Sequence, residues 1–301
     1  MPVPFEPPSV AFPTGAPGRW VRLPPIEDTH DRESRGLILD AADRVRPGRA
    51  IALGAGHCRE IPLVELCRRF EHLTLNDHDG PALEAALRDS GLDAGKDRLL
   101  VADLTGVTAA FVREVGRSLD ATADPGAAID QVAQVADSTR PEAFRTDGSY
   151  DLVVASCVLG QLHVAACNRA IQLFVAKFPA RVDEFRHSDR WTRAMYGLAR
   201  RMESTFIDSL HGLAEPDGRI VLSESVRFCF LYPSGDGGWM TNGFYRMTRT
   251  TRLTDELDDR FVVERRGRWS WIVDPPAAPG QVGRLFDVEG LLLRKKCGVE
   301  C

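Results

Sequence analysis

Two glycines and one aspartate lie at a spacing that suits a nucleotide-like ligand. Gly54 and Gly56 follow the apolar run 50–53, and Asp77 follows Gly56 by about 20 positions, the offset expected of a ribose-binding carboxylate. Glycine has no Cβ, so the backbone can approach a ligand closely, and the helix predicted to follow offers N–H groups to an anionic group. A turn or helix-cap aspartate is the structural alternative for Asp77.

Polar residues also end two further apolar runs. Asp103 follows the run 99–102, and Ser156 and Cys157 follow the run 152–155. We expect Asp103 to accept the amino group of an adenine, with a helix cap as the alternative. Because no base partner stands near Cys157 in the sequence, a packed thiol is favoured over a nucleophile.

Two residues are candidates for contact with a second substrate. His163 follows the fourth apolar run, and its titration range suits proton removal, while a solvent-exposed histidine at a helix start is the alternative. Glu224 follows the run 220–222 and could orient or deprotonate an acceptor, or be a surface carboxylate. The stretch 227–251, rich in aromatic residues and glycine, suggests a substrate wall on flexible backbone or ordinary loop anchoring.

Short apolar runs alternate with stretches of helical spacing, which predicts βαβ units. The strand-like runs are 50–53, 73–75, 99–102, 152–155 and 220–222. Runs without internal alternation are typical of strands buried on both faces, as in a parallel sheet covered by helices. Such sheets bind ligands beyond the carboxyl ends of their strands, where the polar residues above are expected.

Other segments are predicted to be extended or helical. Residues 1–28 form a proline-rich arm that cannot hold a helix or a central strand. Residues 29–46 have the pattern of a helix. The stretch 164–211 is predicted to be a helical insertion, broken near Pro179, that could cover a ligand. It belongs to one predicted domain, 29–301.

The order of these residues resembles that of the class I S-adenosylmethionine-dependent methyltransferases. The resemblance extends over residues 30–296 and includes the turn 216–218, the helix 253–257 and a closing pair of antiparallel strands, 261–263 and 285–294. It implies an α/β, Rossmann-like methyltransferase fold with a mostly parallel sheet, an antiparallel C-terminal strand and helices on both faces. The implied cofactor is S-adenosyl-L-methionine.

The resemblance also implies roles for individual residues. By position, Gly54 and Gly56 border the methionine part of the cofactor, Asp77 holds the ribose, Asp103 with Leu104 borders the adenine, and Ser156 and Cys157 flank the sulfonium. Two positions depart from the pattern. Ala52 stands where many members carry an acidic residue, and Cys58 stands where many carry a third glycine. The contact to the methionine ammonium is therefore not assigned.

Two other functions remain open. A non-catalytic binding or scaffold protein could keep this fold after losing the acidic residue and the third glycine. An NAD(P)-dependent oxidoreductase would use the same glycine turn, but Arg59 replaces the third glycine of its G-x-G-x-x-G pattern.

The composition narrows the partners and the compartment. The chain has 301 residues, a formal net charge of -5 and 44% hydrophobic residues, as expected of a folded globular protein. This charge gives no electrostatic reason to bind nucleic acid or an anionic membrane, and without a signal segment the cytoplasm is expected. We expect a small-molecule acceptor and no metal. RNA and protein acceptors stay open, whereas no Asn-Pro-Pro-Tyr-type element supports DNA methylation.

Overall fold

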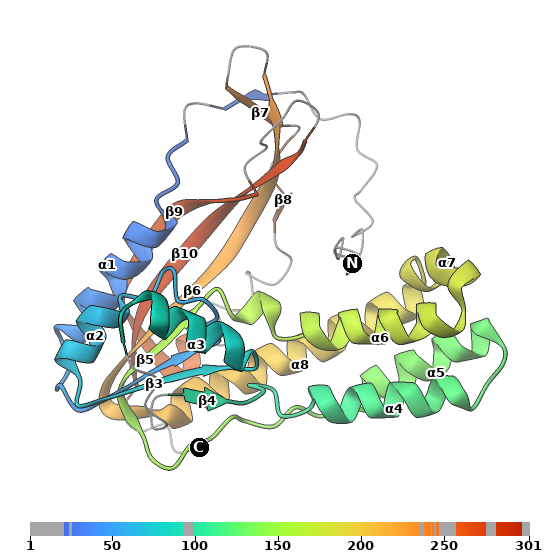
Figure 1. Ribbon diagram of the computed structural model, residues 1–301, viewed down its shortest axis with the longest axis horizontal. Helices are drawn as coiled ribbons and strands as arrows, with labels where there is room; N and C mark the ends of the chain where they lie inside the picture. The colour runs from blue at the N-terminus through green and yellow to red at the C-terminus, as the bar shows by residue number, and fades with distance from the viewer. Residues whose placement is uncertain are drawn as a thin grey trace. The chain divides into compact units, whose positions relative to one another are not determined.

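The computed structural model describes residues 21–23, 26–92, 99–234, 238–241, 243, 245–246, 257–274 and 281–296 (Figure 1). The described chain forms two compact units. The sheet unit consists of Ala16–Ala102, Arg145–Val158 and Ser209–Cys301, and the helical unit contains Asp103–Phe144 and Leu159–Asp208. All the strands named below belong to the sheet unit.

Among the described residues, five strands run parallel in the order β4, β3, β2, β5 and β6. They are β2 (Arg49–Leu53), β3 (His72–Asp77), β4 (Leu99–Val101), β5 (Tyr150–Ser156) and β6 (Ala214–Pro233). The chain starts in the middle at β2, moves outward to β4 and returns to β5. The carboxyl ends of β2 and β5 therefore border the reversal of strand order, where open α/β sheets bind their ligands.

Antiparallel strands close the other side of this sheet. β10 (Gly283–Lys295) lies between β6 and β9 (Phe261–Val273) and runs antiparallel to both. This is the closing pair predicted from residues 261–263 and 285–294. The strand order confirms the predicted fold class, an α/β sheet that is mostly parallel with antiparallel C-terminal strands.

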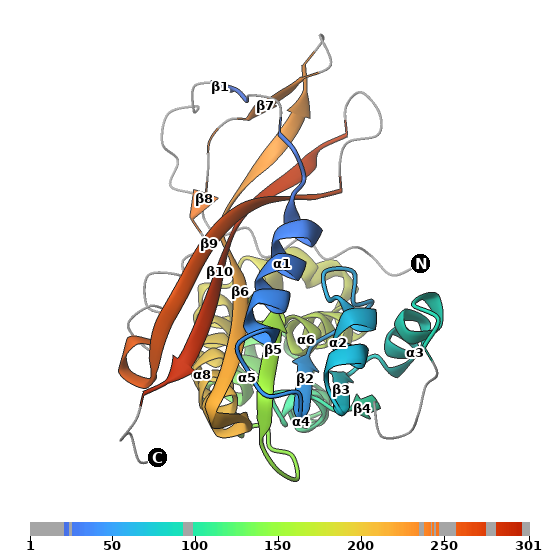
Figure 2. The ribbon, with the colours of Figure 1, turned by 90° about the vertical axis from the view of Figure 1, so that its left-hand side faces the viewer.

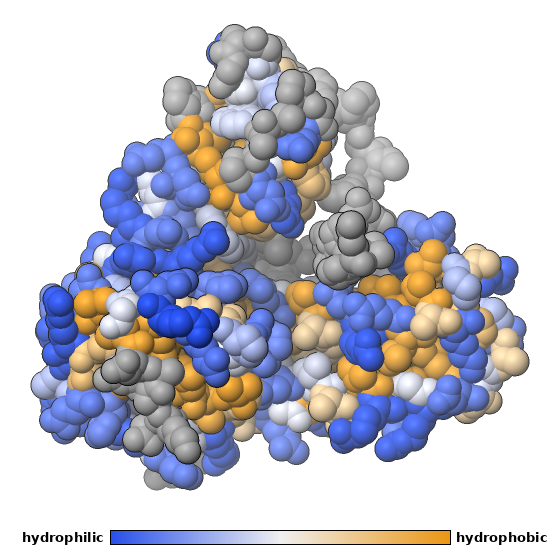
Figure 3. Space-filling view, in the orientation of Figure 1, coloured by the Kyte–Doolittle hydropathy of each residue, from blue (hydrophilic) through white to orange (hydrophobic). Residues whose placement is uncertain are grey.

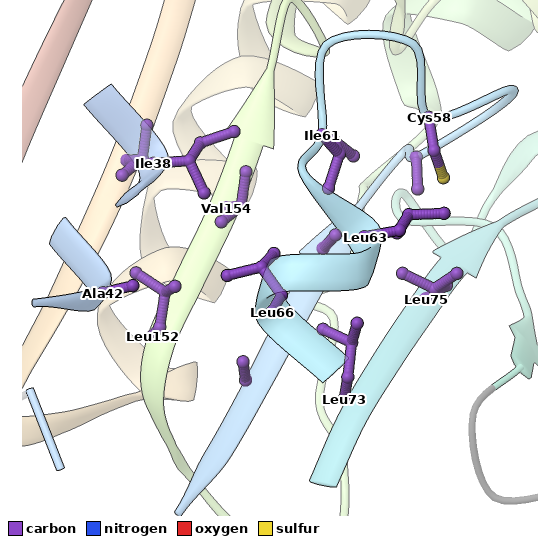
Figure 4. Packing of buried hydrophobic residues seen from close by; sticks show 14 of the residues in the cluster. Ile38, Ala42, Cys58, Ile61, Leu63, Leu66, Leu73, Leu75, Leu152 and Val154 are labelled. Atoms are coloured by element: carbon purple, nitrogen blue, oxygen red, sulfur yellow. The ribbon is translucent and has the colours of Figure 1, made fainter. Parts of the chain in front are cut away.

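Helices α1 (His30–Ala42), α2 (Leu63–Arg69) and α3 (Gly80–Asp89) share one apolar core with the sheet. Alternate strand residues face this core, since Ala50 and Ala52 belong to it and Ile51 does not. In Figure 4, Leu66 of α2 points between Leu152 and Leu73 of two different strands. Figure 2 shows α1 and α2 beside these strands. Burial of alternate residues thus fixes the face on which the helices pack.

The sheet extends beyond the predicted strands, and this corrects one expectation. β6 has 20 residues, and its pairing with β5 shifts register from Ala214 to Arg219, so the predicted turn 216–218 coincides with an irregularity in this strand. The predicted aromatic loop 227–251 is wrong in its first part, since Phe228 pairs with Phe286 of β10 and Cys229 with Leu285. Cross-strand pairing of these apolar side chains with β10 stabilises a strand here, although several glycines follow in the sequence.

Short strands complete this extension of the sheet. β7 (Trp239–Thr241) pairs with the end of β6 and with β1 (Val21–Arg22), while β8 (Tyr245–Arg246) pairs with Arg227 and Phe228 of β6. Figure 3 shows hydrophobic residues gathered over this part of the sheet unit. Leu23, Leu231 and Leu285 belong to a second, smaller core here.

The helical unit contains the predicted insertion. Its helices are α4 (Thr108–Asp120), α5 (Pro125–Ser138), η2 (Leu159–Gln161), α6 (Val164–Lys177), η3 (Pro179–Arg181), α7 (Val182–Arg186) and α8 (Asp189–Leu213) up to Asp208. The ring of Phe185 stacks on Phe174 with centroids 4.2 Å apart and lies 4.7 Å from the Trp191 ring. Arg201 of α8 donates to the carbonyl oxygen of Ala136 at 2.6 Å. The predicted break near Pro179 is observed as η3.

Some predictions fall outside the described residues. These are the arm from residue 1 to 20 and the first four residues of the predicted helix 253–257. Among the residues that the structure does describe, no helix has the length and apolar character that a membrane crossing needs.

Candidate cofactor site

The turn between β2 and α2 has the backbone geometry that its glycines predict. Gly54 has a φ of 60° and Gly56 a φ of 49°, both in the left-handed region. A Cβ on Gly54 would lie 2.7 Å from a methyl carbon of Val158. Both the backbone conformation and the lack of space therefore require glycine at this position. A Cβ on Gly56 would have Asp77 Oδ2 at 3.9 Å as its nearest neighbour, which leaves room above this residue.

The aspartate after β3 holds this turn. Asp77 Oδ2 accepts a hydrogen bond of 2.9 Å from the Gly56 N–H, so the structure brings together two residues that the sequence predicts to share a site. Asp77 Oδ1 accepts from the Asp79 N–H at 2.9 Å and lies 3.0 Å from His78 Nδ1. The turn role that was the alternative for Asp77 is therefore present. Whether this carboxylate also binds a ribose stays a prediction.

Three backbone N–H groups of the turn itself are engaged. The Ala55 N–H donates to the Asn76 carbonyl at 2.9 Å, and the Cys58 N–H donates to the Ala55 carbonyl at 2.8 Å. The Gly56 N–H donates to Asp77, and the binding of an anionic group by N–H groups at the start of α2 stays a prediction. Backbone donors that fold the turn tightly cannot also bind a phosphate or carboxylate.

Cys58 adopts the conformation that favours glycine. Its φ is 53°, and its side chain is buried against the core, as Figure 4 shows. Burial, with smaller contributions from Glu60 and Asp77, raises the pKa of the Cys58 thiol to about 12. The thiol is therefore protonated at neutral pH and is a packing group. The departure from a third glycine thus preserves the backbone turn.

Burial explains why position 52 carries alanine and not an acidic residue. Its side chain is fully buried in the core shared by α1, α2 and the sheet. A carboxylate at this position would lie among apolar side chains, where an unpaired charge is costly. β2 therefore presents no acid, and any anionic contact at this turn has to come from another residue.

The end of β5 pairs with the middle of β6, where Ser156 lies opposite Ser223. Ser156 Oγ lies 3.0 Å from Ser223 Oγ, and Cys157 Sγ lies 3.8 Å from the same hydroxyl. Burial, with Glu224 nearby, raises the pKa of the Cys157 thiol, so the packed-thiol interpretation fits this environment better than a nucleophile. Ser223 was not among the predicted site residues. Its signal was its place beside Glu224, directly after the predicted strand 220–222.

Glu60 is a second residue that sequence reasoning missed. It lies two positions after Cys58, in the turn that contains both glycines, and its side chain is half-buried. Burial raises the pKa of the Glu60 carboxyl, and its own backbone N–H opposes this by hydrogen bonding. Asp31 adds to the rise, whereas a hydrogen bond with Ser156 lowers the pKa again. A half-buried carboxyl group with a raised pKa thus lies in the turn that has no acid on β2.

Glu224 lies in β6 opposite Glu289 of β10. Its side chain is half-buried, and its Oε1 accepts from the Ser225 N–H at 3.1 Å. Gly54, Gly56, Asp77, Ser156 and Cys157 belong with it to the sheet unit; the roles predicted for these residues remain predictions.

The other predicted site residues belong to the helical unit. Asp103 accepts from the Thr105 N–H and the Thr108 N–H, each at 2.9 Å, which is a local capping arrangement. Burial would raise the pKa of Asp103, but these hydrogen bonds outweigh it and lower the pKa. Leu104 is buried, and His163 is a half-buried residue that precedes α6, its carbonyl accepting from the Cys167 N–H. Their predicted contacts with cofactor or substrate stay predictions.

The residues of the turn offer hydrogen-bond acceptors to a ligand that has a ribose and an ammonium group. A carboxylate can accept about four hydrogen bonds. Three groups lie within hydrogen-bond distance of the Asp77 carboxylate, namely the Gly56 N–H, the Asp79 N–H and Nδ1 of His78. One of them is the exposed imidazole of His78, which can give way to a hydroxyl. The turn offers carboxyl oxygens from Asp77 and Glu60, and its backbone N–H groups are largely engaged. S-adenosylmethionine has both a ribose and a primary ammonium group to match them.

No protein-family model and no curated protein matches the chain. Solved structures are similar to it at low identity. A methyltransferase from Clostridium acetobutylicum that depends on S-adenosylmethionine is 9% identical, with 88% of this chain and 91% of that chain covered and a TM-score of 0.41. The ribosomal protein L11 methylase from Lactobacillus delbrueckii subsp. bulgaricus is 12% identical, with 88% and 79% covered and a score of 0.38. TehB from Haemophilus influenzae is 11% identical, with 87% and 62% covered and a score of 0.43. All three scores are below 0.5, so the fold assignment rests on the strand order itself.

Proposed function

We propose that this protein is a methyltransferase that uses S-adenosyl-L-methionine. The observation that carries the proposal is the hydrogen bond between the Gly56 N–H and Asp77 Oδ2, at the ends of neighbouring parallel strands. It places a carboxylate beside a turn with room above Gly56, at the reversal of strand order. The antiparallel β10 between β6 and β9 supports a methyltransferase over a nicotinamide-dependent enzyme, as does Arg59 in place of a third glycine.

The cofactor, when bound, supplies a methyl group already activated on a sulfonium. The chain then has to hold the cofactor, place an acceptor lone pair in line with the methyl carbon and exclude water. Asp77 would accept the ribose hydroxyls, and Gly56 would let the ligand approach the backbone. Ser156 and Cys157, at the end of β5, would lie toward the sulfonium. Asp103 and Leu104 would border the adenine.

The acceptor substrate is proposed to be a small molecule. The net charge of -5 gives no general attraction to an RNA backbone, and an activated sulfonium makes a dedicated base optional. Glu224 and His163 are the residues proposed to orient or deprotonate the acceptor. An RNA or protein acceptor would be revealed by methyl transfer from labelled cofactor to the corresponding fraction of a cell extract.

Calorimetry with S-adenosylhomocysteine tests the proposal. The wild-type protein should bind this product, and Asp77→Asn should weaken binding by about 1–3 kcal/mol because the ribose hydroxyls lose a charged acceptor. The amide keeps the shape of the side chain and one oxygen for the Gly56 N–H. Glu84→Gln, at an exposed position of α3, is the matched control and should bind as the wild type does.

Other outcomes favour other functions. No binding of S-adenosylhomocysteine at millimolar concentration would favour a scaffold protein that retains the fold. A change in NADH fluorescence on mixing would favour the oxidoreductase. Unchanged affinity in Asp77→Asn would remove this residue from the site.

A further inference from the structure

We propose that the outer edge of β9 binds an extended acidic segment of a partner protein as an additional strand. The surface, called the β9 edge below, consists of the backbone and side chains of residues 266–268. It belongs to the sheet unit alone. Its binding is separate from the proposed methyl transfer and does not depend on it.

β9 has a single neighbouring strand, β10, within the part of the chain that the structure describes (Figure 2). The Ser270 carbonyl accepts a hydrogen bond of 3.3 Å from the Thr29 N–H, so the backbone groups of Ser270 point away from β10. Alternate residues of an antiparallel strand point their N–H and C=O groups to the same side. Since the ladder has no register shift between 266 and 270, the backbone groups of Arg266 and Arg268 also point outward. Such an edge can accept a further strand.

The β9 edge carries an excess of positive charge. The side chains of Arg266 and Arg268 are 48% and 55% exposed, and both lie near the same carboxylate, that of Glu289. The distances to Glu289 Oε1 are 3.6 Å from Arg266 Nη1 and 3.7 Å from Arg268 Nε, longer than a usual hydrogen bond. Glu289 lies on β10, and Glu224 lies opposite it, one strand further in. The two guanidinium groups are therefore the charges that a strand docked on β9 would have beside it.

This charge also decides which strand fits the edge. If a second copy of β9 paired antiparallel about Gly267, Arg266 of each copy would face Arg268 of the other. Like charges directly opposite each other destabilise a sheet. A segment that alternates acidic and apolar residues instead places all its carboxylates on one face. Arg266 and Arg268 are two residues apart and share a face, so these carboxylates match both side chains.

Arginines at an exposed edge also have a protective role. Charged edge residues commonly prevent aggregation between copies of a protein. At the β9 edge the same repulsion that excludes a second copy leaves an acidic segment as the favoured partner, which is how a repulsive element gives specificity.

Peptides of about nine residues, a usual strand length, test the assignment. One peptide alternates glutamate with valine, and a second alternates lysine with valine. By fluorescence anisotropy, the wild-type protein should bind the labelled glutamate–valine peptide at least roughly 10-fold more tightly than the lysine–valine peptide. A glutamate–valine peptide with a methyl group on each internal backbone nitrogen keeps its charges and loses its strand donors. It should bind at least about 10-fold more weakly than the unmodified peptide.

Variants of the edge separate charge from strand pairing. Arg266→Glu combined with Arg268→Glu should reverse the preference, so that the lysine–valine peptide binds more tightly. Arg113→Glu combined with Arg193→Glu is the matched control, since it changes the net charge equally at exposed positions of the helical unit, and should keep the wild-type preference. Arg268→Pro removes an outward N–H and should weaken binding of the glutamate–valine peptide more than Arg268→Ala does.

Equal affinity for the two charged peptides, or for the unmodified and the N-methylated peptide, would overturn the proposal. So would an unchanged preference after charge reversal at the edge. A concentration-dependent dimer of the wild type that Arg268→Pro abolishes, measured by ultracentrifugation, would replace the acidic segment with a second copy of this chain. Thermal unfolding identifies any variant that fails to fold, and the peptide comparisons on the wild-type protein decide the matter without it.

Discussion

At the scale of single residues, Cys58 shows that a residue other than glycine can keep the backbone conformation of the turn. A left-handed backbone costs an L-residue roughly 1–2 kcal/mol, a cost that glycine avoids. Cys58 bears this cost at a φ of 53° while burying its side chain. The position therefore retains the backbone requirement of a glycine, and the thiol contributes packing.

The first residue-scale prediction compares glycine and alanine at this position. Cys58→Gly should have a free energy of unfolding about 1 kcal/mol above that of Cys58→Ala, because only glycine adopts the left-handed region freely. Cys67, within α2, is the matched control. There the order should reverse by roughly 0.5–1 kcal/mol, since glycine destabilises a helix interior. Urea denaturation measures both pairs, and the same order at the two positions would contradict the strain at Cys58.

The residue scale also shows how far the site was predictable. The spacing of Gly56 and Asp77 predicted that they would meet, and they share a hydrogen bond. Ser223 was not predicted because its neighbour Ser156 lies far away in the sequence. Glu60 was not predicted because Asp31, whose charge acts on it, belongs to another element. Which backbone N–H groups a turn consumes is likewise a property of three-dimensional structure.

At the scale of elements, α1 begins on a buried histidine. His30 is 2% exposed, and its Nδ1 accepts a 2.9 Å hydrogen bond from Trp269 Nε1. The ring of Trp271 stacks on it with centroids 4.3 Å apart. An acceptor nitrogen carries no proton, so the imidazole is neutral in this arrangement. α1 is thus joined to β9 by a contact that acid should break.

The element-scale prediction follows from this contact. Burial lowers the pKa of His30, and the opposing charges of Asp31 and Asp28 offset this only in part. Below the ordinary pKa of about 6.5, the unfolded chain binds a proton that the folded protein resists, so stability should fall as the pH drops through this region. Urea denaturation at pH 7.5 and pH 5.5 should show a larger loss for the wild type than for His30→Gln. His72→Gln, exposed on β3, should behave as the wild type; equal losses in all three would contradict the prediction.

Elements also differ in how well the sequence predicted them. The short runs that became β2, β3 and β5 were recognised because strands buried on both faces are uniformly apolar. The outer half of β6 was read as a loop because its aromatic residues precede several glycines. Its strand character comes from pairing with β10, which is distant in sequence.

At the scale of the whole molecule, each of the two described units has a buried core of its own. Leu66 is fully buried in the core of the sheet unit, and Phe185 is fully buried in the helical unit. We expect Leu66→Ala to cost about 2–5 kcal/mol and Phe185→Ala about 3–5 kcal/mol of stability. Hydrogen exchange should accelerate first within the unit that carries the substitution. Uniform acceleration throughout the described chain would show instead that the units unfold as one.

The placement of β10 has a consequence for synthesis. This strand is near the end of the chain, yet it lies between β6 and β9, which emerge from the ribosome before it. Until β10 is made, each of these long strands exposes backbone donors and acceptors that another molecule can capture. We therefore expect the nascent protein to be most prone to aggregate after β6 has left the ribosome and before β10 pairs with it.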